Sequence, residues 1–258
     1  MIKELVEAAG TINAIKVEIS VHDASLSIVT GMNAKTWAWR NGKIEVVDSD
    51  TQYVGQKIFD PRDFDVADIS GMFATAAGLA KSSSGQQLQI VEYADRTVYM
   101  TVTTNPESLT VFFRQDGSLV SQVDLTTLAG IQEAYSDVVG TKQYVNQLGI
   151  LPNQGGMYVD VAVLDTIVRT VRQPRLPVRT TTRNESTTLA PFDPAVVKPT
   201  IIASSLDKIC AKANLSSVPV GWSLVVSSKD NTAEPRMYFT VNGVQTVMTL
   251  DGVDVTPH

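Results

Sequence analysis

The sequence predicts an α+β fold made of two tandem related copies, residues 1–124 and 125–258, each an antiparallel β-sheet with one main packed α-helix. Three repeated segments carry this prediction: Phe59-Asp60-Pro61 and Phe192-Asp193-Pro194, Val98–Val102 and Met237–Val241, and Asp116-Gly117 and Asp251-Gly252. Their offsets are 133, 139 and 135 residues, so the copies differ by short insertions between shared elements. A chain of 258 residues has room for two domains of ordinary size.

The composition is that of a packed globular protein, with 43% hydrophobic and 19% charged residues. No apolar run approaches the roughly 18 residues that suggest a membrane span. No pattern of a secretory leader is present either, which leaves two expectations for localisation: the cytoplasm, or an extracytoplasmic site if a leader or anchor was removed. Cys210 is the single cysteine, so no internal disulfide is expected.

The first copy opens with an amphipathic stretch over residues 1–7, followed by strand-like runs at 17–21 and 25–29. Asn41-Gly42 separates two further apolar runs, which is a strong hairpin signal. After the first Phe-Asp-Pro, apolar residues recur at helical spacing. They are Ile69, Phe73, Ala76, Ala77 and Ala80. Asp65 and Asp68 stand where a helix cap and a first-turn carboxylate are expected.

The second copy predicts a helix over residues 125–148 and a strand over 157–161. Its main helix follows the second Phe-Asp-Pro, where Pro199 suits the first turn. Adding 133 to the helical positions of the first copy gives Ile202, Leu206, Ile209, Cys210 and Ala213. In both copies the main helix precedes strand runs that end at an Asp-Gly turn. The pattern indicates one helix face packed on each sheet.

The two copies differ in charge. Residues 1–128 hold 16 acidic and 10 basic side chains, a net charge of −6, whereas residues 129–258 hold 11 of each. Non-specific nucleic-acid binding needs a basic surface. We therefore expect no nucleic-acid partner.

Five arginines within 15 residues distinguish the second copy. They are Arg169, Arg172, Arg175, Arg179 and Arg183, in a stretch without acidic residues. This segment replaces the part of the first copy that carries Trp37 and Trp39. Guanidinium groups bind carboxylates, phosphates and sulfates through paired hydrogen bonds. Two interpretations stay open: these arginines bind an anionic ligand or acidic partner, or they pair with the acidic first copy.

Other candidates for chemistry favour structural roles. His22-Asp23 is interpreted as a turn between two strands, and Cys210 as a buried core residue. The aspartates between residues 60 and 68 lack the glycine and glutamate of a calcium loop. Neither a phosphate-binding loop nor histidines at metal-ligand spacing are present. We expect no catalytic residues, no cofactor and no metal site.

The order of elements resembles the helix-on-sheet modules of PepSY type. The resemblance covers residues 58–120 and 191–255, each with Phe-Asp-Pro, an amphipathic helix and a strand meander ending in Asp-Gly. It concerns architecture alone and transfers no functional residue. The resemblance implies a bacterial, extracytoplasmic protein that binds or restrains a partner.

These observations favour a non-enzymatic binding or scaffolding protein that uses a groove between the copies or the arginine segment. Two alternatives stay open. One is a structural homodimer that pairs edge strands between chains, and the other is a hydrolase that works through carboxylates. The expected partners are a protein or an anionic ligand.

Overall fold

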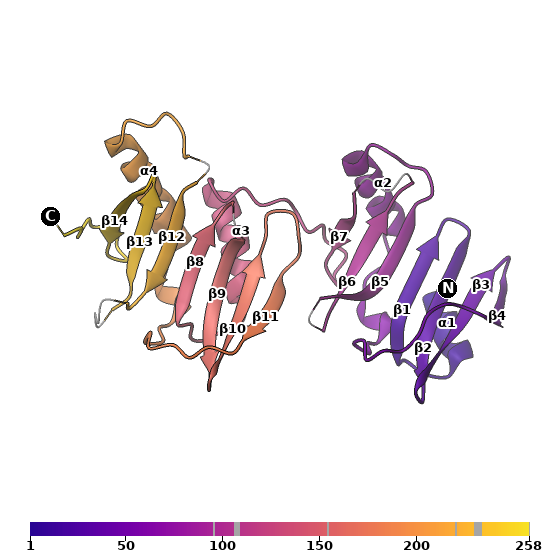
Figure 1. Cartoon of the computed structure of the whole chain (residues 1–258). Helices are drawn as coiled ribbons and strands as arrows, with labels where there is room; N and C mark the ends of the chain where they lie inside the picture. The colour runs from indigo at the N-terminus through magenta and orange to yellow at the C-terminus, as the bar shows by residue number, and fades with distance from the viewer. Residues whose placement is uncertain (95, 106–108, 154, 220, 230–233, 258) are drawn as a thin grey trace. The chain divides into compact units, whose positions relative to one another are not determined.

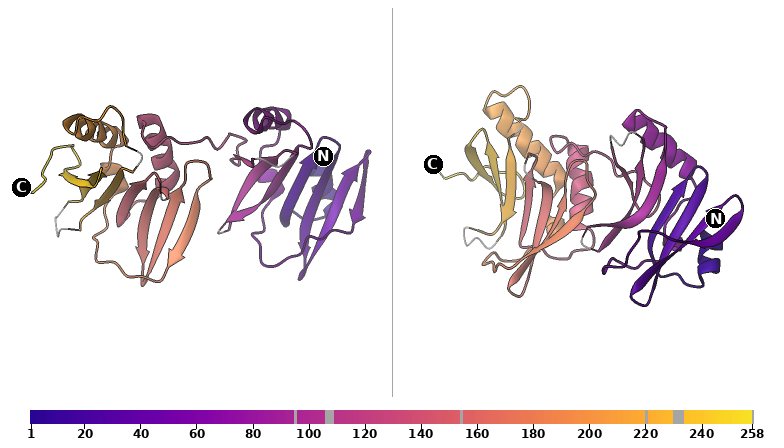
Figure 2. Two further views of the ribbon diagram at one scale, coloured as in Figure 1. Left: turned by 45° about the horizontal axis from the view of Figure 1, so that its top comes forward. Right: turned by 45° about the vertical axis from the view of Figure 1, so that its right-hand side comes forward.

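The structure is a computed structural model that describes residues 1–94, 96–105, 109–153, 155–219, 221–229 and 234–257. The chain divides into two compact units, unit 1 (Met1–Val120) and unit 2 (Ser121–His258). Each unit contains one seven-stranded antiparallel sheet. In each, the helices lie on a single face of the sheet (Figures 1 and 2). These features confirm the predicted α+β class.

The elements of unit 1 follow one another as α1 (Ile2–Ala9), β1 (Ala14–Ser20), β2 (Asp23–Thr30), β3 (Asn33–Arg40), β4 (Lys43–Val47), the 3-10 turn η1 (Pro61–Asp63), α2 (Ile69–Ala80), β5 (Gln87–Ala94), β6 (Thr97–Thr103) and β7 (Val111–Phe113). The strand order in the sheet is β4-β3-β2-β1-β5-β6-β7. The expected hairpin turn joins β3 to β4, with positive φ at both Asn41 and Gly42.

The elements of unit 2 are α3 (Leu128–Val139), β8 (Gln147–Leu151), β9 (Gly156–Val163), β10 (Thr166–Arg172), β11 (Arg179–Arg183), the 3-10 turn η2 (Pro194–Val196), α4 (Pro199–Lys212), β12 (Ser223–Ser227), β13 (Arg236–Val241) and β14 (Val244–Met248). The strand order is β11-β10-β9-β8-β12-β13-β14. This is the order of unit 1 repeated element for element, as the sequence duplication predicts.

Each core lies between the helices and one face of the sheet. In unit 1 it joins Leu5 of α1 and Met72 of α2 to residues such as Val17 and Leu88 on the strands. In unit 2, Ile202, Leu206, Ile209 and Cys210 of α4 pack on the sheet together with α3. Cys210 is 6% exposed, and burial raises the pKa of its thiol. Its predicted place in the core is confirmed.

The predicted cap of α2 is present, whereas the predicted first-turn carboxylate is not, because the first turn of α2 holds no acidic residue and Asp65 lies before the helix. Asp68 is the N-cap of α2 and accepts a hydrogen bond from the Gly71 N–H at 3.0 Å. Pro199 is the first residue of α4, where its missing N–H leaves no intrahelical bond unmade. Asp60 and Asp193 each cap the 3-10 turn that precedes the main helix. The two Phe-Asp-Pro segments therefore have the same role, which is to cap and begin a 3-10 turn.

One prediction about helices needs correction. The helix expected over residues 125–148 ends at Val139, because Gly140 has a positive φ and β8 begins at Gln147. The main helices of the two units are α2 and α4, and each sheet also carries a first helix, α1 or α3. In the part of the chain that the structure describes, no helix is both long and apolar enough to cross a membrane.

Candidate functional site

The arginine segment forms the outer two strands of the unit 2 sheet. Arg179 and Arg183 lie on β11, at the sheet edge, opposite Val171 and Ile167 of β10. Because side chains alternate along a strand, Arg169 of β10 shares its sheet face with Arg179 and Arg183. This is the face away from the helices. We call these three residues the arginine face.

Arg172 points to the opposite side of the sheet and is fully buried. Its guanidinium donates to Asp137 Oδ2 at 2.8 Å and to the backbone oxygens of Gln173, Ser121 and Leu176. It therefore binds α3 and the segment before α3 to the end of β10. Because these hydrogen bonds use its donors, Arg172 has a structural role in unit 2.

Asp160 of β9 is the centre of the arginine face. It is 2% exposed, and it accepts two hydrogen bonds from Arg169, both at 2.7 Å. Arg183 donates a third, at 3.1 Å, and also binds Glu185 at 2.5 Å. The hydrogen bonds to Asp160 raise the pKa of Arg169. One buried carboxylate thus orients two guanidinium groups.

Aromatic rings extend this face across the sheet. The strand pairings place one residue of each strand in a single row: Arg179, Val171, Tyr158, Gly149, Val225, Tyr238 and Val247. Cations cover both tyrosine rings in the row, Arg169 at 3.7 Å from the Tyr158 centroid and Lys229 at 3.8 Å from that of Tyr238. The face is therefore both aromatic and cationic.

Glycine at position 149 makes room for the Tyr158 ring. A Cβ atom on Gly149 would lie 2.3 Å from ring atoms of Tyr158, far inside normal contact distance. The ring lies across β8, and its hydroxyl accepts a hydrogen bond from Gln147 at 2.8 Å. Burial raises the Tyr158 pKa. The guanidinium group of Arg169 lies over this ring.

Two arginines of the segment differ from the others because no carboxylate pairs with them among the described residues. Arg175 lies in the turn between β10 and β11, is exposed, and donates to the side-chain oxygen of Gln122 at 3.2 Å. The Nε atom of Arg179 is buried, and within the described ranges it has no hydrogen-bond partner. A buried donor without a partner is unfavourable, and the Arg179 side chain therefore has unused hydrogen-bonding capacity.

Sequence reasoning named the arginines but missed the residues that orient them, Asp160, Tyr158 and Gly149. One signal was present in the sequence. Asp160 interrupts the apolar run of β9, and an aspartate inside a buried strand needs a cationic partner. Among the described residues, the side chains that accept hydrogen bonds from Arg169, Arg172, Arg175 and Arg183 all belong to unit 2.

The remaining candidates occupy turns. His22 is exposed between β1 and β2, and its backbone N–H donates to Ser20 Oγ at 3.2 Å. Asp60 pairs with Arg62 at 2.7 Å, while Asp65 accepts from the backbone of Ala67. No group of three or more metal-ligating side chains occurs among the residues described.

Among the described residues, the carboxyl groups with a clearly altered pKa are all shifted downward. They are Asp60, Glu92, Asp116, Asp124 and Asp254. Hydrogen bonds donated by neighbouring residues are the leading cause in each case. A general acid needs the opposite shift, so these groups do not support the hydrolase alternative.

Asp254 yields a prediction about pH. Hydrogen bonds from Thr256, followed by one from Lys212, lower its pKa to about 2. We expect Asp254→Asn to be less stable than the native chain between pH 5 and 7, because the ionised carboxylate stabilises the fold above its unfolded pKa. The difference should shrink from about pH 4 and vanish near pH 2. Urea unfolding midpoints of both proteins across this range provide the measurement, and a gap that persists below pH 2 would contradict the assignment.

Comparisons with known proteins give no family. No family model matches the chain, and no curated protein matches it. Among solved structures, PCNA from Thermococcus kodakaraensis aligns at 9% identity over 96% of this chain and 94% of its own, with a TM-score of 0.19. The DNA polymerase III beta subunit from Thermotoga maritima aligns at 9% identity over 96% and 57%, with a TM-score of 0.18. Similarity at this level supports no argument, and the resemblance to PepSY modules stays a prediction.

Proposed function

We propose that the chain is a non-enzymatic binding protein that holds a carboxylate-bearing segment of a partner protein on the arginine face of unit 2. The observation that carries the proposal is the surplus of guanidinium groups on this face and in the adjoining turn between β10 and β11, which holds Arg175. Arg169 and Arg183 are oriented by Asp160, whereas Arg175 and Arg179 have no carboxylate partner among the described residues. The binding residues are therefore Arg175 and Arg179, with Arg183 beside them.

The chemistry of the face favours carboxylates. Asp160 and Glu185 pair with guanidinium groups of the same face, which supports a carboxylate as the ligand. The chain as a whole has a net charge of −6, and such a charge repels a polyanion approaching from a distance. A short acidic peptide that reaches only the edge strand β11 experiences less of this repulsion.

The test compares two double variants with the same change in net charge. Arg175→Gln/Arg179→Gln removes the two arginines that lack a carboxylate partner, and Lys81→Gln/Lys208→Gln removes two exposed lysines elsewhere. The probe is a fluorescent glutamate-rich peptide, and affinity is measured by anisotropy. Two charge-assisted hydrogen bonds are worth about 1.5–3 kcal/mol each, so the arginine variant should bind at least about tenfold more weakly. The lysine variant should bind as the native chain does.

Three results would contradict the proposal. They are no binding of the peptide by the native chain, equal weakening in both double variants, and equal affinity of native and arginine-variant chains. Random-sequence duplex DNA serves as a second probe, because guanidinium groups bind phosphates as well as carboxylates. If the chain binds DNA through Arg175 and Arg179 and does not bind the peptide, the ligand of this face is a nucleic acid rather than an acidic peptide. Circular dichroism of each variant controls for folding.

A further inference from the structure

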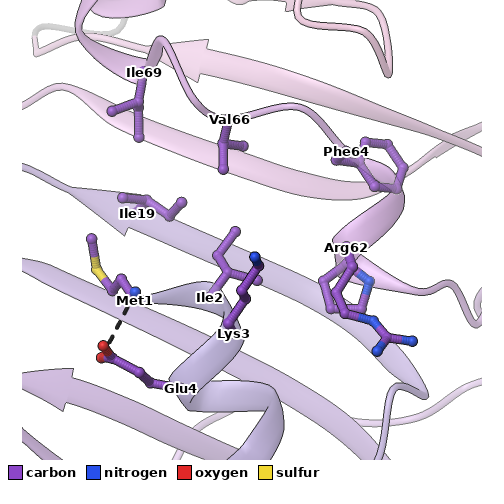
Figure 3. Close-up of a pocket in the computed structure, with 10 residues that line it drawn as sticks. Met1, Ile2, Lys3, Glu4, Ile19, Arg62, Phe64, Val66 and Ile69 are labelled. Atoms are coloured by element: carbon purple, nitrogen blue, oxygen red, sulfur yellow. Dashed lines mark ion pairs between the residues drawn. The ribbon is translucent and has the colours of Figure 1, made fainter.

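A groove of about 470 Å³ lies in unit 1 between α1, the turn η1 and the segment leading into α2. Its walls are mainly apolar: Ile2, Ile19, Pro61, Phe64, Val66 and Ile69. Figure 3 shows Ile2 on α1 and Phe64, Val66 and Ile69 on the facing segment, with Ile19 of β1 between them. Small-molecule sites have volumes of this order and similar apolar linings.

The corresponding space in unit 2 is bridged by a side chain. Tyr135 lies on α3, the first helix of unit 2, as Ile2 lies on α1, the first helix of unit 1. The Tyr135 hydroxyl donates to the backbone oxygen of Pro194 in η2 at 2.5 Å. A tyrosine thus joins the first helix to the 3-10 turn in unit 2, whereas in unit 1 the groove lies between these two elements.

One cation at the groove has no partner among the described residues. Arg62 is engaged by Asp60 through three side-chain hydrogen bonds, and Glu4 pairs with the amino group of Met1 at 3.7 Å. Lys3 makes no hydrogen bond or ion pair with any residue that the structure describes, and its side chain runs beside that of Ile2 (Figure 3). An apolar site bordered by one unpaired ammonium group is complementary to an aliphatic body with a single negative charge.

We infer that this groove binds a small aliphatic carboxylate of medium chain length. The chain packs against Ile2, Ile19 and Phe64, and the carboxylate accepts hydrogen bonds from the Lys3 ammonium group. The site is independent of the arginine face, because every residue that lines it belongs to unit 1.

The experiment introduces into unit 1 a tyrosine like the one that joins helix to turn in unit 2. Ile2→Tyr should fill the groove, and Val66→Trp should fill it from the facing wall. Ala8→Tyr places the same added ring on the exposed side of α1 and is the matched control. Binding of decanoate, kept below its micellar concentration, is measured by titration calorimetry on the full chain.

The native chain should bind one decanoate, each groove-filling variant should bind at least about tenfold more weakly, and Ala8→Tyr should match the native chain. Lys3→Gln should weaken decanoate binding by about tenfold while leaving decan-1-ol binding unchanged. Absence of saturable binding, or unaltered binding by both groove-filling variants, would overturn the inference. So would self-association of the native chain that Ile2→Tyr abolishes, since the occupant would then be a second copy. Because no variant touches an arginine of unit 2, failure here leaves the proposed function untouched.

Discussion

Replacing Arg172 by methionine is expected to lower the free energy of unfolding of unit 2 by about 3–5 kcal/mol, the usual cost of removing one partner of a buried ion pair. Arg172 is fully buried and binds Asp137, while three backbone oxygens also accept its hydrogen bonds. Methionine fills much of the same volume but donates nothing. The carboxylate and the carbonyl groups would then lose their partner in a poorly hydrated place.

The control for this prediction is Arg175→Met, because Arg175 is three residues away and exposed. A surface substitution of this kind should change stability by no more than about 0.5 kcal/mol. Urea unfolding monitored by circular dichroism gives the free energies, and amide hydrogen exchange in β10 assigns the loss to unit 2. Equal stabilities of the two variants would show that the Arg172 network contributes little.

The fold was predictable because its signals are local and occur twice. Asn41-Gly42 specifies a hairpin turn, Asp68 a helix cap, and the apolar spacing around Ile202 and Leu206 a packed helix face. Repetition of the same signals at nearly constant offset made each one more specific. The end of α3 was missed because its apolar pattern continues past Gly140, and the positive φ of this glycine depends on the turn toward β8.

The arrangement of the candidate site depends on the pairing of strands, which the sequence does not state. Arg169 and Asp160 are nine residues apart and meet because β9 and β10 pair in this register. A shift by one residue would move every side chain to the other face. The same holds for Tyr158 and Gly149, whose contact requires β8 beside β9. The arginines could be identified from the sequence. Which of them are buried and which are available to a ligand could be determined only from the strand pairing of the sheet.

Replacing Gly130 by alanine is expected to destabilise unit 2, although alanine is normally the better helix former. Gly130 lies in the first turn of α3, and a Cβ atom there would stand 2.0 Å from the backbone oxygen of Asp124. That oxygen is held in place by hydrogen bonds from the backbone and side chain of Thr127. Since backbone cannot rotate away as a side chain does, the start of α3 must shift. Overpacking of this kind costs about 1–3 kcal/mol.

Gly78→Ala gives the opposite sign and serves as the matched control. Gly78 lies inside α2, is exposed, and has open space where its Cβ would stand. Alanine should therefore stabilise unit 1 by up to about 1 kcal/mol through helix propensity alone. Urea unfolding of the two single variants measures both effects. Stabilisation by both substitutions would contradict the prediction. It would show that the segment from Asp124 to Thr127 can shift with little loss of stability, and that helix propensity outweighs close packing at position 130.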